Sequence, residues 1–230
     1  MGRFFLLALR NASSIITQNN CDRIALEKTA KLSSCIIANS IYLPVLTSGP
    51  KHHILWVGRS ADFKRPHRFF ELVQSFPNET FMMICPQASN DKNYETLCSK
   101  AKTFKNLTFY SHIDYHQIMP YYQQAKIYIN TSDSEGFPNT FVQAGAAGTA
   151  ILSFAVNPDD FLTRYNCGLC CRGDMDKLKA GLAFLLDGQR YIEIGKNGRK
   201  YVEENHDIST IVEQYKAVFM RLAEQKRRTR

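Results

Sequence analysis

The strongest constraint on the fold is an alternation of short apolar runs with segments of helical periodicity. Runs such as His53–Val57 and 80–85 are rich in β-branched and large apolar residues, and apolar residues three or four positions apart follow them. Continuous apolar strands that alternate with helices are typical of a parallel sheet covered on both faces. The sequence therefore predicts an α/β fold with a parallel sheet covered on both faces. The expected strands are 13–17, 35–38, 53–57, 80–85, 107–110, 126–130, 150–154 and 169–171, and the expected helices are 4–12, 22–31, 66–76, 94–104, 116–124, 139–147, 158–165, 175–186, 189–205 and 208–221.

Length and composition exclude several classes of protein. The chain has 230 residues, with 44% hydrophobic and 22% charged residues, which is a globular balance and excludes disordered and low-complexity classes. The apolar run at 4–9 is far shorter than the roughly 20 residues of a membrane span, and no secretory leader is expected. Seven scattered cysteines indicate reduced thiols, so we expect a cytoplasmic location.

The net charge of +8 is concentrated at the C-terminus, where Lys226, Arg227, Arg228 and Arg230 supply half of it. Such a basic tail is most simply a frayed, solvated terminus. A basic tail can also contact acidic lipid, which would make the protein peripheral to the inner face of a membrane. Nucleic acid is not an expected partner, because no zinc finger or aromatic-basic repeat accompanies the tail.

Two segments that follow predicted strands carry the candidate chemistry. Ligands of open parallel sheets bind beyond the carboxyl ends of the strands. Gly58 ends one strand, and Arg59 and Lys64 lie five residues apart on the next loop, where they suit a diphosphate; the alternative is two solvated loop cations. The second segment, 132–144, is an acidic loop that leads into a helix near Asn139. The free amides of that helix favour an anion, and the alternative is a capped helix start with an exposed Glu135.

The two segments, in this order and at this separation, resemble the donor-binding domain of family 4 glycosyltransferases, which have the GT-B fold. The family pattern has G-R-x(4)-K-G after a strand and, much later, E-G-F-G-x-P-x-x-E-A before a small-residue turn. The chain has Gly58-Arg59-x(4)-Lys64 and then Glu135-Gly136-Phe137. Further agreement at 146–153 (AAGTAILS), 165–169 (YNCGL), 198–203 (GRKYVE) and 206–208 (HDI) extends the resemblance from about His53 to Leu222.

The resemblance implies a role for each matching residue. Arg59 and Lys64 would hold the diphosphate of a nucleotide sugar and stabilise its charge as it leaves, and Glu135 would lie against the donor sugar; these are the expected catalytic residues. Gln143 would face the ribose, and the helix amides at Asn139 and Thr140 would bind phosphate or sugar. The loop that frames the base would place His112 against it, with the Ile113 backbone at its edge. The implied donor-binding residues are Gly58, His112, Ile113, Gly136, Phe137, Asn139, Thr140 and Gln143.

The sequence departs from the family pattern in its motifs. Gln143 stands where the family has a glutamate, which alters the hydrogen bonds offered to hydroxyls. Pro138 and Arg65 replace two glycines, and a proline stiffens the loop and removes one N–H donor.

The chain is also short for a complete two-domain GT-B enzyme. Residues 1–50, which end in a Pro- and Gly-containing linker, resemble only the end of the first, acceptor-binding domain, while 51–230 form the donor-binding domain with its closing helices. The resemblance therefore implies a Rossmann-like, doubly wound parallel sheet, the C-terminal half of a GT-B fold, with a short remnant of the first domain. The chain would be a fragment, a cloned domain or one subunit of a split enzyme.

The expected function is that of a retaining glycosyltransferase (hexosyltransferase) domain of polysaccharide biosynthesis. Its partners would be a nucleotide-diphosphate sugar, a glycan or lipid-linked acceptor, and a missing N-terminal domain or partner subunit. The alternatives are a non-catalytic nucleotide-sugar-binding or interaction module and, less favoured, a nucleotide-sugar epimerase relative. No metal or separate cofactor is expected, because the C-x-x-C at Cys167 and Cys170 lacks a second pair.

Overall fold

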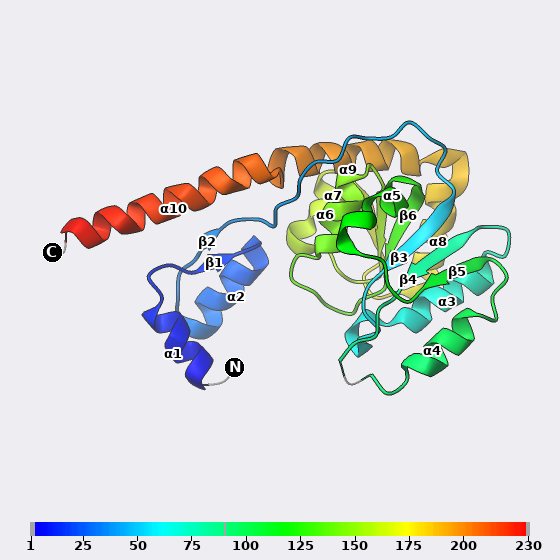
Figure 1. Cartoon of the computed structure of the whole chain (residues 1–230), viewed down its shortest axis with the longest axis horizontal. Coiled ribbons are helices and arrows are strands. Elements are labelled where there is room, and N and C mark those ends of the chain that lie inside the picture. Colours follow the sequence, from blue (N-terminus) through cyan, green and yellow to red (C-terminus); the bar gives the residue numbers. More distant parts are fainter. Residues whose placement is uncertain (1–2, 90, 229–230) are drawn as a thin grey trace.

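The computed structural model describes residues 3–89 and 91–228, and its centre is a six-stranded parallel sheet (Figure 1). The strand order is β5-β4-β3-β6-β7-β8, and every neighbouring pair is parallel. The chain moves outward from β3 in one direction and then returns to continue from β6 in the other, which is the doubly wound arrangement. The strands are β3 (His53–Val57), β4 (Phe81–Ile84), β5 (Leu107–Tyr110), β6 (Ala125–Asn130), β7 (Ala150–Ser153) and β8 (Gly168–Cys170).

Helices cover both faces of this sheet, as the continuous apolar strands require. Successive strand side chains point to opposite faces, so Ile54 and Trp56 enter one core while Leu55 enters the other. One core lies under α3, α4, α8 and the start of α9, and the other lies under α5, α6, α7 and the end of α9. These helices are α3 (Pro66–Ser75), α4 (Tyr94–Ala101), α5 (Met119–Gln123), α6 (Asn139–Ala146), α7 (Phe161–Arg164), α8 (Met175–Leu186) and α9 (Tyr191–Asn205).

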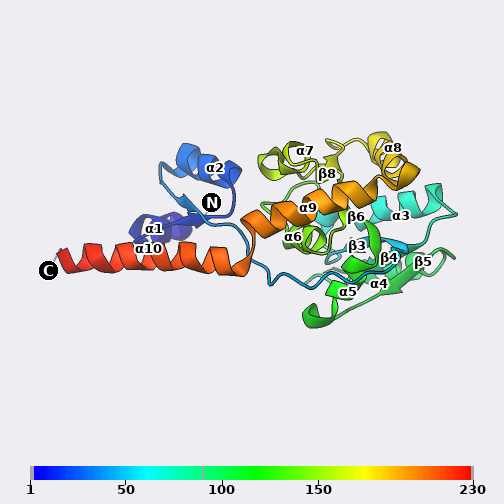
Figure 2. The same cartoon turned by 90° about the horizontal axis from the view of Figure 1, so that it is seen from above.

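A small N-terminal segment stands apart from this body. It contains α1 (Arg3–Asn11), β1 (Ile16–Thr17), α2 (Asn20–Ala30) and β2 (Cys35–Ile36), and β1 pairs with β2 in parallel. The last helix, α10 (Ile208–Arg228), leaves the body and extends past the N-terminal segment (Figures 1 and 2). Arg221 of α10 lines a pocket together with Leu9 and Arg10 of α1. The division between a remnant and a donor-binding domain at residue 50 stays a prediction.

The segment meets the body at the loop that follows β7. Asp159 accepts hydrogen bonds from the first backbone N–H groups of α2, at 2.7 Å from Asn20 and 2.9 Å from Cys21. Asp159 and its neighbour Asp160 both have a positive φ, 52° and 54°, which costs free energy for residues other than glycine. A single bridge between Ile41 and Asp207 also joins the two parts.

Most expected elements are confirmed, and the differences have local causes. The expected helix over 116–124 starts at Met119, because Pro120 fits only the first turn of a helix. The expected helix over 189–205 starts at Tyr191, because Gly188 and Gln189 adopt positive φ.

The described part of the C-terminus is a helix and not a frayed tail, while its basic side chains are exposed as the expectation of a solvated terminus had it. Helix α10 continues past the expected end at Arg221 through Lys226, Arg227 and Arg228, and cations in a last helical turn interact favourably with the helix dipole. Arg230 lies outside the described residues. The apolar run at 4–9 is not buried as a core: Phe4, Phe5 and Leu7 have exposed fractions of 89%, 54% and 58%.

Candidate functional site

The predicted site loops meet where the strand order reverses. Strands β3 and β6 are neighbours, yet the chain continues from them toward opposite edges of the sheet. In open α/β sheets the crevice beyond the carboxyl ends of two such strands is the usual place for a ligand. The loop after β3 contains the short helix Asp62–Lys64, and the loop after β6 leads into α6, so the fold brings both candidate motifs to this place.

Lys64 and Glu135 are in direct contact across these two loops. The Lys64 Nζ lies 2.5 Å from Glu135 Oε2, and both side chains are largely buried, with exposed fractions of 16% and 12%. Asn130, the last residue of β6, donates from its Nδ2 to the other carboxylate oxygen of Glu135, Oε1, at 2.8 Å. Both oxygens of the carboxylate are therefore held, one by a cation and one by an amide.

The two loops are also tied through their backbones. Thr131 donates its hydroxyl to the Lys64 carbonyl at 2.6 Å, and it accepts a hydrogen bond from Trp56 Nε1 at 2.8 Å. The Asp133 backbone N–H donates to the Phe63 carbonyl at 2.9 Å. Because the buried indole anchors this chain of bonds to β3, Lys64 and Glu135 are carried on a rigid support.

Two arginines stabilise the acidic side of the loop. Arg65 Nε and Arg68 Nη1 each lie 2.6 Å from a carboxylate oxygen of Asp133, and these hydrogen bonds hold the pKa of Asp133 below its usual value of 3.8. Arg68 also donates to the Thr131 carbonyl and stacks 3.8 Å from the centre of the Phe154 ring. This ion-pair cluster fixes the loop that carries Glu135.

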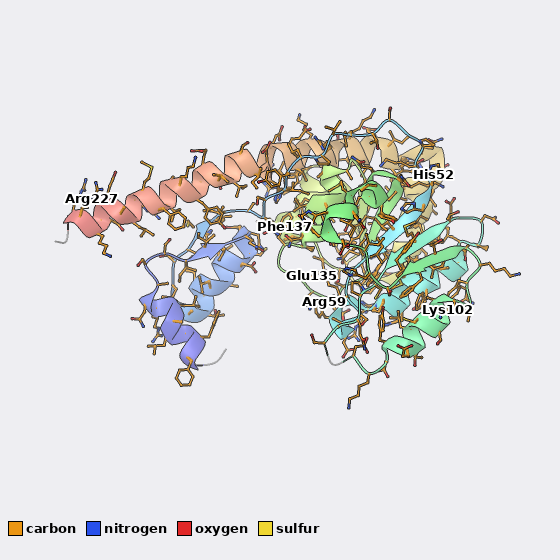
Figure 3. All side chains as sticks on the ribbon, viewed as in Figure 1. His52, Arg59, Lys102, Glu135, Phe137 and Arg227 are labelled. Carbon is orange, nitrogen blue, oxygen red and sulfur yellow. The ribbon has the colours of Figure 1, made fainter. Side chains whose placement is uncertain are left out.

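Arg59 is the exposed cation of the site. Its side chain makes no hydrogen bond or ion pair with any other residue that the structure describes, and Figure 3 places it with Glu135 on the side of the body that faces α2. Gly58 leads into this loop, and a Cβ there would lie 3.2 Å from the Trp56 ring. A larger residue at position 58 would therefore press on the indole that supports Thr131.

The start of α6 offers unused hydrogen-bond donors near Glu135. Within the described parts of the chain, no group accepts from the backbone N–H of Asn139 or Thr140, and the N-cap residue Pro138 supplies no side-chain cap. The hydroxyls of Ser132 and Thr140 are buried, and neither has a hydrogen-bond partner among the described residues. Buried polar groups are usually paired, so this loop has capacity for a polar or anionic ligand.

Gln143 and Phe137 lie deeper than the family resemblance suggested. Gln143 is buried, and its Oε1 accepts a hydrogen bond from the buried Tyr122 hydroxyl at 3.1 Å. The Phe137 ring packs 5.0 Å from the centres of both Phe161 and His206, inside the core over α6 and α7. Their roles toward a nucleotide sugar stay predictions, and in this structure both side chains contact the protein interior.

The remaining predicted residues lie at the edge of the site. His112 is exposed, and its Nε2 lies 3.1 Å from Asp114 Oδ1, while Ile113 packs partly against the second core. The backbone at Gly136 faces α2, because a Cβ there would lie 3.3 Å from Asp22 Oδ2. A cavity of about 260 Å³ lies beside the loop after β3, between α3 and α4.

Sequence reasoning missed the residues that support the site. Asn130 is a buried polar residue at the end of an apolar strand, and that position was the available signal. Asn39 is a second case: its Nδ2 donates to the Phe137 carbonyl at 3.0 Å and to Asn139 Oδ1 at 2.7 Å, although it lies about a hundred residues away in sequence. No group of three or more His, Cys, Asp or Glu residues in the described chain is arranged to hold a metal ion.

The six-stranded parallel sheet and its strand order match the fold of the C-terminal, Rossmann-like domains of GT-B glycosyltransferases. The family model for glycosyl transferases group 1 matches residues 45–201, and the chain belongs to this family. The match includes both loops of the site. No curated protein matches the sequence significantly.

Solved structures from several organisms share the fold at low sequence identity. A sucrose-phosphate synthase from Thermosynechococcus elongatus is 20% identical with a TM-score of 0.81, and the alignment covers 96% of this chain and 61% of that one. A mutant of S. aureus TarM, in complex with Fondaparinux, alpha-GlcNAc-glycerol and UDP, is 16% identical with a TM-score of 0.80 and coverages of 94% and 46%. Anabaena Alr3699/HepE in complex with UDP-glucose is also 16% identical, with a TM-score of 0.78 and coverages of 93% and 65%. The chain thus spans less than two thirds of each of these proteins.

Proposed function

We propose that this chain is the donor-binding domain of a retaining, family 4 glycosyltransferase that transfers a hexosyl group from a nucleotide-diphosphate sugar. The observation that carries the proposal is the contact between Lys64 and Glu135 at the point where the strand order reverses. A cation for a diphosphate and a carboxylate for sugar hydroxyls lie together there. Exposed Arg59 and the free amides at the start of α6 are on the same two loops.

The proposed chemistry is electrostatic. The bond between the anomeric carbon and the diphosphate oxygen breaks, an acceptor hydroxyl oxygen forms a new bond to that carbon, and the hydroxyl proton goes to the departing diphosphate or to water. Lys64, Arg59 and the amides of Asn139 and Thr140 would stabilise the charge that grows on the leaving diphosphate. Glu135 would hold hydroxyls of the donor sugar. Retention of configuration is proposed on the family resemblance.

The acceptor side requires more protein than this chain shows. The aligned structures are longer, and the N-terminal segment exposes Phe4, Phe5 and Leu7. We propose that a further N-terminal domain or a partner subunit completes the cleft and brings a glycan or lipid-linked acceptor. Within the described residues, no helix has the length and apolar character to cross a membrane. A cytoplasmic location and contact of the basic end of α10 with an acidic lipid surface remain predictions.

Calorimetric titration of the purified chain with UDP, GDP, ADP and their glucose conjugates tests the donor site. We expect micromolar to millimolar binding of one nucleotide and its conjugate. Lys64→Ala should weaken that binding at least tenfold, about 1.4 kcal/mol, because a buried cation is lost from the phosphate position. Lys102→Ala is the matched control, since Lys102 is exposed on the same domain (Figure 3). Equal affinities of the two variants would exclude Lys64 from the phosphate site.

A non-catalytic nucleotide-sugar-binding module is the second candidate. It is favoured by one specific observation: Gln143, which replaces the family glutamate, is engaged with Tyr122 inside the protein. The two candidates differ in turnover. A module would bind the nucleotide sugar without releasing nucleotide even when a completing domain and an acceptor are supplied.

A further inference from the structure

The Glu135 carboxylate has both of its oxygens occupied before any ligand is present. Oε2 is paired with the Lys64 ammonium at 2.5 Å, and Oε1 accepts from the Asn130 amide at 2.8 Å. In this arrangement the carboxylate compensates the Lys64 charge, and the ammonium takes one of the two acceptor positions of Oε2 that a sugar hydroxyl could use. A diphosphate that draws the Lys64 ammonium to itself would therefore change this pairing.

We propose that a bound diphosphate replaces the Glu135 carboxylate as the partner of the Lys64 ammonium. This exchange frees Oε2 of Glu135 to accept a sugar hydroxyl, while Asn130 keeps the carboxylate in place. Asn130 is then a positioning residue for the donor sugar. This inference rests on the proposed function, because it assigns diphosphate and sugar to the same two loops. It adds an order to their recognition: the phosphate releases the group that binds the sugar.

Asn130 is built to remain fixed during such an exchange. Its side chain is buried, with an exposed fraction of 2%, and its Oδ1 accepts from the Ser132 backbone N–H at 3.1 Å. Its backbone carbonyl accepts a hydrogen bond from the Phe154 N–H at 2.7 Å, which ties Asn130 to the residue that follows β7. The amide is thus held at its oxygen and presents its N–H to Glu135, so the carboxylate keeps one bond when Lys64 moves.

The Lys64 ammonium, by contrast, can be drawn away. It is a point charge on a flexible stem, and an ammonium follows the larger nearby negative charge. A diphosphate carries more charge than one carboxylate, and the free amides of Asn139 and Thr140 add to its side of the exchange. Glu135 remains a like charge beside the diphosphate, so it opposes anion binding, and a sugar hydroxyl that donates to it offsets part of that cost.

Titration with inorganic pyrophosphate tests the exchange, because the exchange predicts whether Glu135→Gln raises or lowers the affinity for pyrophosphate. Because Glu135→Gln removes the competing anion and keeps the shape, we expect this variant to bind pyrophosphate three- to tenfold more tightly than the wild type. If Glu135 instead serves to hold Lys64 ready for phosphate, Glu135→Gln binds equally or more weakly, and the exchange is overturned. Lys64→Ala in the same series shows that the measured site is the one described.

The positioning role of Asn130 is tested by the ratio of nucleotide-sugar affinity to nucleotide affinity, measured with UDP, GDP, ADP and their glucose conjugates. In Asn130→Ala and Asn130→Asp we expect this ratio to fall at least fivefold, with pyrophosphate affinity of the Ala variant within threefold of the wild type. Asn106→Ala is the control, because Asn106 donates to one backbone carbonyl in α3 and to two between α3 and β4. If Asn130 has a purely structural role, variants at both Asn130 and Asn106 have a lower melting temperature, and the ratio of nucleotide-sugar to nucleotide affinity stays unchanged in both.

The failures of the two proposals are distinguishable. Wild-type protein that binds neither pyrophosphate nor any nucleotide overturns the proposed function together with the exchange. Wild-type binding that Lys64→Ala abolishes keeps the proposed function, and Glu135→Gln and the Asn130 variants then decide the exchange alone. A wild-type protein that binds nucleotides but gains no affinity from the sugar also excludes the positioning role of Asn130.

Discussion

The body and the N-terminal segment are built from the same kind of sequence but differ in burial. In the body, the strands from β3 to β8 pair in one sheet, and their side chains fill two cores. In the segment, β1 and β2 pair only with each other, and between residues 4 and 36 only Asn19 and Ala30 are buried. The difference shows that an apolar run produces a core only where neighbouring elements exist to cover it.

The contacts between the two parts include several polar ones, beside the buried Ile41 that packs into the second core. Asp159 caps α2. Asn39, which follows β2, donates from its side chain to the loop before α6, and its backbone carbonyl lies 2.7 Å from His206 Nδ1. The candidate site lies on the body side of this junction. Under the proposed function, the donor would therefore bind to the body rather than to the segment.

The largest expected effect is a difference in stability between two Phe→Ala variants, one in the body and one in the N-terminal segment. Phe69 is fully buried between Trp56 and Phe81, with ring centroids 6.4 and 5.5 Å away, so Phe69→Ala leaves a cavity and should lower the free energy of unfolding by about 3–5 kcal/mol. Phe4→Ala should change it by less than about 0.5 kcal/mol, because Phe4 is 89% exposed. Urea denaturation of both variants measures the difference. A large loss for Phe4→Ala would mean that another copy or partner covers α1.

The next effect concerns the pH dependence of the body. His53 is buried at the start of β3, its Nε2 lies 3.0 Å from the Tyr121 carbonyl, and burial lowers its pKa from 6.5 to about 4. The unfolded chain binds this proton at higher pH than the folded protein. Stability is therefore fully present above pH 6.5, falls as the pH drops from 6.5 toward about 4, and loses about 3 kcal/mol from this group.

Denaturation curves at several pH values test this histidine. His53→Gln keeps a donor for the Tyr121 carbonyl but cannot titrate, so its stability should fall less steeply between pH 6.5 and 4. The control is His112→Gln, at an exposed position beside Asp114, which should keep the wild-type slope. Equal slopes for all three proteins would show that His53 is not the group responsible.

The sequence predicted the body well because each strand is a local signal. The bounds of β3 and β5 agree with the expected runs, and the two site loops follow the strands that were expected to present them. The end of α10 was missed for a physical reason. Beyond Leu222 the helix has no apolar periodicity, and it continues on residues of high helical propensity, such as Ala223, Glu224 and Gln225.

The supporting contacts of the site were not predictable from periodicity. A pattern of burial indicates that Asn130 lies at the end of a strand, but only the register of β6 and the fold of the next loop bring its amide to Glu135. In the same way, the pattern does not say whether an aromatic residue in a loop faces a ligand or a core. Phe137 faces the core because Phe161 and His206, from distant parts of the chain, pack around it.

The smallest effect tests the junction itself. Asp159→Ala removes the acceptor for the Asn20 and Cys21 N–H groups, and loss of such a helix cap costs about 1 kcal/mol. Asp160→Ala is a matched control, because Asp160 shares the positive φ but makes no bond to α2 that the structure describes. Hydrogen exchange should show faster exchange in α2 for Asp159→Ala alone, with the strands of the body unchanged. If both variants loosen α2 equally, backbone strain in this loop, rather than the carboxylate, connects the segment to the body, and the junction would be a property of the loop conformation.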